Sequence, residues 1–130
     1  MKAPIVRVQV SRAPGDCAIC ALAMLLDVPY EDVLAAAVKT TGGSRVHHGG
    51  MWTRDMKRTA KKLGVTLTLH RSFDLDQDEG VLSTEGGDRS QHAVLLKSGL
   101  VFDGDCTVWK ADEYLAAQGH RPLSLLVMEV

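Results

Sequence analysis

The sequence is poor in cysteine, has almost no net charge and lacks long apolar runs. Three cysteines in 130 residues are too few, and odd in number, for the disulfide framework of a small secreted domain. Fifteen basic and sixteen acidic side chains leave a formal charge of −1, which argues against general nucleic-acid binding. The longest apolar stretch, Ala18 to Leu26, is far shorter than the roughly 20 residues of a membrane span. We therefore expect a cytoplasmic protein with neither nucleic acid nor membrane as a partner, and composition leaves its oligomeric state open.

The remaining composition is ordinary for one globular domain. Hydrophobic residues make up 45% of the chain and charged residues 24%, which excludes disordered and collagen-like classes. The length suits a single domain covering residues 1–130.

Local patterns predict a leading strand, a block of helices and then mostly strands. Asp16 is a good N-cap, and no charged residue follows it up to Leu26, so a helix over 17–26 must be buried on every side. The segregation of helices from strands predicts an α+β fold in which this core helix packs on an antiparallel sheet. Further helices are expected at 30–39, 53–63 and 111–118, and strands at 6–10, 65–69, 80–84, 91–97, 100–103 and 123–130, with Ser98-Gly99 as a hairpin turn.

Cys17 is the most informative position because it opens the buried helix just after the Pro14-Gly15 loop. Unpaired amides and the positive end of the helix dipole stabilise a thiolate there, and the same amides can receive an oxyanion. His92, near the start of a strand, is a candidate base. Asp103 ends the partner strand across the Ser98-Gly99 hairpin, where it can hold the second ring nitrogen of His92. A Cys-His-Asp triad follows as a hypothesis.

These motifs carry a resemblance to a known family. The stretch DCAICALAMLL, a helix ending in KKLGV, a strand opening with QHAVLL and a return to VFDGD resemble the papain-like, double-glycine (bacteriocin-processing) cysteine peptidases and their stand-alone relatives. The resemblance extends from about Gln9 to Asp105. It implies a papain-like fold in which Cys17 is the nucleophile, His92 the general base and Asp103 the residue that orients it.

The sequence differs from the family pattern at two places. Ala18 follows the cysteine where the family usually has glycine, and Ser11 occupies the position of the glutamine that completes the oxyanion hole. Gln9, two residues upstream, is the candidate replacement, acting together with the backbone amide of Cys17. Substrate-cleft candidates are His48, in a glycine-rich loop, and Trp52 just after it.

The implied activity is thiol-dependent hydrolysis of a peptide or isopeptide bond in a peptide or protein substrate, with no cofactor and no metal. One alternative is a catalytically inactive, peptidase-like binding module. An acyl transferase would use the same three residues, since only the acceptor differs. Two other readings are dithiol redox chemistry by Cys17 and Cys20, a Cys-x-x-Cys pair at a helix start, and a zinc site. The candidate zinc ligands are Cys17, Cys20, His47, His48 and Cys106.

Overall fold

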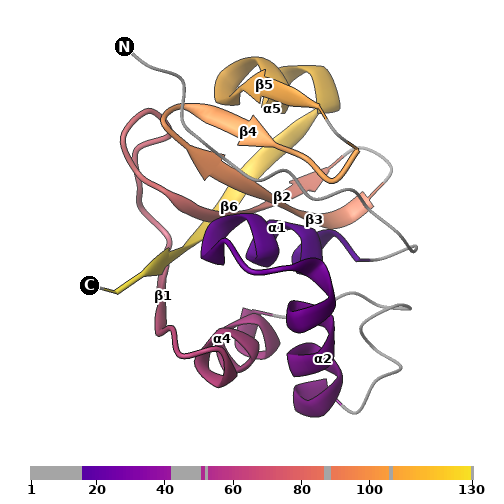
Figure 1. The fold of residues 1–130 in the computed structure, drawn as a ribbon. Helices are drawn as coiled ribbons and strands as arrows, with labels where there is room; N and C mark the ends of the chain where they lie inside the picture. Colours follow the sequence, from indigo (N-terminus) through magenta and orange to yellow (C-terminus); the bar gives the residue numbers. More distant parts are fainter. Residues whose placement is uncertain (1–15, 42–50, 52, 87–88, 106, 130) are drawn as a thin grey trace.

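The computed structural model describes residues 16–41, 51, 53–86, 89–105 and 107–129. Within these residues the fold is mixed α+β, with four helices and one antiparallel six-stranded sheet (Figure 1). The predicted α+β class is confirmed. The helices are α1 (Cys17–Leu26), α2 (Tyr30–Thr41), α4 (Thr53–Lys62) and α5 (Ala111–Gln118).

Helix α1 is the core helix that the sequence predicts. Every residue from Ala18 to Leu25 is buried, and the side chains of Ile19 and Leu22 are completely inaccessible to solvent. Each such aliphatic side chain contributes about 1.5–3 kcal/mol when removed from water. The helix ends at Asp27, whose left-handed backbone (φ 54°) lets its N–H reach a carbonyl oxygen one turn back, a conformation that aspartate tolerates better than most residues.

Helices α2 and α4 lie side by side on the side of α1 away from the sheet (Figure 1). Val33 and Ala37 of α2 pack in the same apolar cluster as Met56 and Ala60 of α4. The predicted stop at Gly64 is confirmed, because this residue adopts the left-handed conformation (φ +87°) two residues after the end of α4.

The six strands form one sheet in the order β1-β6-β2-β3-β4-β5, with every neighbouring pair antiparallel. Strands close in sequence are therefore mostly hairpin partners, except that the last strand inserts between β1 and β2. The strands are β1 (Leu67–His70), β2 (Gly80–Gly86), β3 (Arg89–Lys97), β4 (Leu100–Phe102), β5 (Val108–Lys110) and β6 (His120–Met128).

The hairpin of β3 and β4 turns at Ser98-Gly99, as the sequence predicts. Both turn residues have positive φ, 54° and 75°, the combination that a two-residue hairpin turn with the strand twist requires. The register pairs Lys97 with Leu100 and Leu95 with Phe102, so the residue after β4 lies near the middle of β3, two positions from His92.

The sheet is covered on both faces. Val81 and Leu95 pack with α1 in one apolar cluster, whereas Leu82 and Leu96, one position further along each strand, pack with α5 in a second cluster. The alternation of side chains along a strand produces this division. The sheet is therefore the middle layer between the α1 side and α5.

Several predicted strand boundaries are wrong. The final strand begins at His120 and not at 123, because Pro122 sits within it at a register irregularity opposite Thr84, a place where a missing N–H is tolerated. Strand β1 covers Leu67–His70 instead of 65–69, β2 and β3 extend beyond their predicted ends, and β5 was not predicted. The predicted strand at 6–10 lies outside the described residues. No helix within the described residues is long and apolar enough to cross a membrane.

Candidate active site

Cys17 is the first residue of α1 and is half-buried. Its position is the one that the sequence predicts, at a helix start where backbone amides have no partner within the helix. Cys20, one turn further on, is completely buried, and both cysteines are reduced. Cys20 packs in the apolar cluster around α1.

Asp16, which precedes the cysteine, does not cap the helix with its side chain as predicted. Its carboxylate is buried and accepts a hydrogen bond from the hydroxyl of Tyr30, with the two oxygens 2.8 Å apart. This bond joins the start of α1 to the start of α2 and so fixes the backbone that carries Cys17. The sequence did not indicate Tyr30, because no local pattern distinguishes it from any other tyrosine on a helix.

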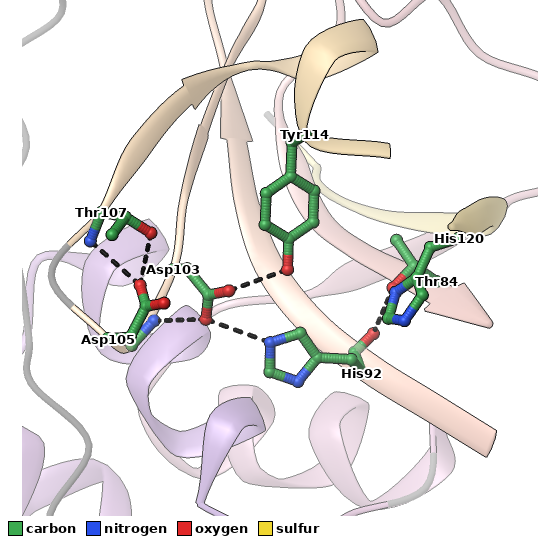
Figure 2. Close-up of polar contacts among 8 residues, drawn as sticks. Thr84, His92, Asp103, Asp105, Thr107, Tyr114 and His120 are labelled. Carbon is green, nitrogen blue, oxygen red and sulfur yellow. Dashed lines mark hydrogen bonds and ion pairs between the residues drawn. The ribbon is translucent and has the colours of Figure 1, made fainter. Parts of the chain in front are cut away.

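His92 and Asp103 are brought together by the β3-β4 hairpin. The Nε2 atom of His92 lies 3.0 Å from Oδ1 of Asp103, and both residues are largely buried (Figure 2). With Nε2 directed at the carboxylate, Nδ1 is the ring nitrogen left for another partner. In Figure 2 this second nitrogen faces away from Asp103.

The Asp103 carboxylate has donors at both oxygens. Oδ1 accepts a hydrogen bond from the backbone N–H of Gly104 at 2.7 Å in addition to its contact with His92. Oδ2 accepts from the hydroxyl of Tyr114 on α5, at 2.8 Å (Figure 2). Sequence reasoning missed Tyr114, since only the packing of α5 against the sheet brings it to Asp103.

The turn after Asp103 is held in place by its own hydrogen bonds. The N–H of Asp103 donates to the carbonyl oxygen of Thr107 at 3.0 Å. The carboxylate of Asp105 accepts hydrogen bonds from the N–H and the hydroxyl of Thr107, as aspartate does in turns. These bonds fix the chain direction at the point where the Asp103 side chain leaves β4.

Cys17 forms a hydrogen bond with His92 and interacts with its charge. Burial by itself raises the pKa of the thiol, but the His92 contact and the backbone amides of Ala93 and Ala18 outweigh burial and hold that pKa below its ordinary value of 9.0. The amide of Ala18 belongs to the first turn of α1, so the helix start contributes as the sequence predicts.

The pKa of His92 is raised from 6.5 to about 9. Burial opposes the charged ring, but hydrogen bonds to Asp103 and Cys17, together with their negative charges, more than offset burial. Burial also raises the pKa of Asp103, yet the contacts with His92, Tyr114 and Gly104 bring it below its ordinary value of 3.8. The three groups therefore support a thiolate, an imidazolium and a carboxylate, which places a nucleophile beside a proton donor.

The backbone carbonyl of His92 has a polar contact of its own, with the side chain of Thr84. The hydroxyl of Thr84 donates to the carbonyl oxygen of His92 at 3.5 Å and lies 2.9 Å from Nδ1 of His120 (Figure 2). Thr84 is completely buried. This contact links β2 and β6 to the strand position that carries the candidate base.

Other predicted site residues lie outside the described residues, namely Gln9 of the oxyanion hole and the cleft candidates His48 and Trp52. Their roles stay predictions. The same holds for the proposed zinc ligands His47, His48 and Cys106. Among the residues that are described, no group of three or more His, Cys, Asp or Glu side chains is arranged to hold a metal ion.

Comparison of the chain with protein-family models finds no match, and no curated protein matches it. The function is therefore inferred from the residues and their geometry.

Proposed function

We propose that the protein is a papain-like cysteine peptidase that hydrolyses a peptide or isopeptide bond through Cys17, His92 and Asp103. The observation that carries the proposal is the continuous chain of contacts from the Cys17 thiol through the His92 ring to the Asp103 carboxylate. A buried histidine in a sheet needs only one partner to be satisfied. Here the ring has two partners, a cysteine at a helix start and a carboxylate, the arrangement that thiol nucleophiles use.

The proposed reaction begins with attack by the Cys17 thiolate on the substrate carbonyl carbon. Amides at the start of α1 are suited to receive the negative charge that develops on the carbonyl oxygen. The His92 imidazolium then donates its proton to the leaving amine, which gives an acyl-enzyme and a neutral ring. The neutral ring removes a proton from water, which attacks the acyl group and releases the acid and the thiolate.

Asp103 holds the imidazole during both proton transfers. Its Oδ1 atom at 3.0 Å from Nε2 orients the ring and leaves Nδ1 for the thiol, and its negative charge stabilises the imidazolium. The mechanism needs a free, reduced thiol, which fits the cytoplasmic location expected from the low cysteine count.

The proposal is tested by alkylation with iodoacetamide followed by mass mapping of each cysteine. At pH 6.5 we expect Cys17 to react at least about tenfold faster than the thiol of glutathione, because it is more fully ionised. Peptide-library profiling should detect cleavage that Cys17→Ala abolishes. Cys20→Ala is the matched control, since it removes a thiol from the same helix without touching His92, and it should retain cleavage.

Two results separate this proposal from its alternative. If Cys17 reacts no faster than glutathione, the thiol is not activated and the proposal is wrong. If Cys17 reacts rapidly but no peptide is cleaved, an inactive, peptidase-like binding module becomes the better description.

A further inference from the structure

Tyr114 is the buried side chain that connects α5 to the candidate active site. We propose that Tyr114 is a positioning residue that acts through Asp103 to control how tightly His92 holds its proton. The inference builds on the proposed function, but its test needs no substrate.

The hydrogen bonds of Asp103 restrict the orientation of its carboxylate, and Tyr114 makes one of them. The hydroxyl of Tyr114 donates to Oδ2 at 2.8 Å, while Oδ1 receives the Gly104 N–H at 2.7 Å and faces Nε2 of His92 at 3.0 Å. Rotation of the carboxylate would break the bonds at both oxygens. Tyr114 therefore fixes the orientation in which Oδ1 meets the histidine ring (Figure 2).

Tyr114 is itself rigidly placed. It is only 1% exposed and packs in the apolar cluster on the α5 face of the sheet. Its ring meets that of Trp109 edge to face, with centroids 6.2 Å apart, a favourable aromatic geometry. The N–H of Ala111, at the start of α5, donates to the carbonyl oxygen of Gly99 in the β3-β4 turn. The helix that carries the phenol is thus tied to the hairpin that carries His92.

The hydroxyl has an electrostatic effect as well as a positional one. A neutral donor on Oδ2 stabilises the negative charge of Asp103 and lowers the pKa of this carboxyl. A carboxylate stabilised in this way attracts the proton on His92 less strongly. The consequence matters for the proposed reaction, because His92 must release its proton to the leaving amine.

The groups that surround His92 allow this effect to be isolated. Cys17 of α1 and Asp103 at the end of β4 contact the ring, whereas His120 of β6 reaches only the backbone of His92 through Thr84. The hydroxyl of Tyr114 donates a hydrogen bond to Asp103. Tyr114→Phe removes that hydroxyl and keeps the aromatic ring that packs in the α5 cluster.

The experiment measures the titration of the His92 ring by NMR from pH 5 to pH 11, in the wild type and in Tyr114→Phe. With the donor lost, the midpoint should move upward from about 9 by roughly half a pH unit or more. Leu115→Ala is the matched control: it removes core packing on the same helix, keeps the hydroxyl, and should leave the midpoint unchanged.

Three outcomes overturn the inference: an unchanged midpoint in folded Tyr114→Phe, a downward shift, or an equal upward shift in Leu115→Ala. Circular dichroism of each variant establishes that it is folded. If Tyr114→Phe does not fold, Trp109→Phe keeps the hydroxyl but loosens the ring, and an unchanged midpoint there would overturn positional control. Failure of the proposed function is detected separately in the wild type, by slow alkylation of Cys17 or by the absence of peptide cleavage.

Discussion

Replacing Asp103 by asparagine is the most informative single change in this protein. Asparagine has nearly the same shape, and its Oδ1 can still accept from His92 and from the Gly104 N–H. Its NH₂ group then faces the Tyr114 oxygen, which can accept instead of donate. The substitution therefore removes one negative charge from the site with little loss of packing or hydrogen bonding.

The magnitude follows from the pKa of His92. A rise from 6.5 to about 9 corresponds to roughly 3 kcal/mol in favour of the imidazolium, or a factor of a few hundred. This stabilisation is shared between Asp103 and Cys17, while burial opposes it. We expect Asp103→Asn to lower the pKa of His92 by about one to two pH units, so that peptide cleavage at pH 8.5, which needs the protonated ring, falls by roughly 3- to 25-fold.

The assay is the rate of iodoacetamide inactivation between pH 5 and pH 10, with peptide cleavage measured in parallel. In the wild type, cleavage should decline above about pH 9, when the His92 ring loses the proton that the leaving amine needs. In Asp103→Asn this decline should begin at lower pH. Thermal unfolding serves as the control for folding. An identical pH profile in the two proteins would show that the Asp103 charge does not act on His92, and would refute the reasoning.

Two further predictions concern stability. The pKa of Asp103 lies below 3.8 in the folded state, so its contribution to stability is full above pH 3.8 and is lost as pH falls through the folded-state pKa. In urea unfolding, the stability of the wild type should therefore decline more steeply in acid than that of Asp103→Asn. Parallel curves for the two proteins would contradict this. Tyr30→Phe removes the buried hydrogen bond to Asp16 and should lower the free energy of unfolding by about 1–3 kcal/mol, measured by urea unfolding. An unchanged unfolding midpoint would show that this bond does not anchor α1.

The sequence was sufficient for elements whose signals are local. An uninterrupted run of apolar residues after Asp16 predicts α1, because such a helix is stable only when it is buried on all sides. Ser98-Gly99 predicts the hairpin, because few residue pairs adopt positive φ at both positions. Since that hairpin sets the register, the approach of His92 to Asp103 was also predictable.

Boundaries that depend on a partner strand were not predictable. Pro122 suggests a strand that starts after it, but the irregularity opposite Thr84 absorbs the missing N–H within β6. Strand β5 has three residues and an exposed Val108, so its sequence has no hydrophobic alternation to reveal it. Pairing with β4 alone makes it a strand.

The candidate site also has a part that the sequence predicts and a part that only the folded structure determines. By itself, the sequence determined that a cysteine would stand at the start of a buried helix, and which histidine and aspartate a hairpin would bring together. Only the tertiary structure decided which groups surround them: Tyr114 on Asp103, Tyr30 on Asp16, and the His92 ring between thiol and carboxylate. The physical reason is that capping, turn chemistry and periodicity act over a few residues, whereas the charge states of Cys17, His92 and Asp103 depend on burial and on hydrogen bonds between layers that meet only when the chain is folded.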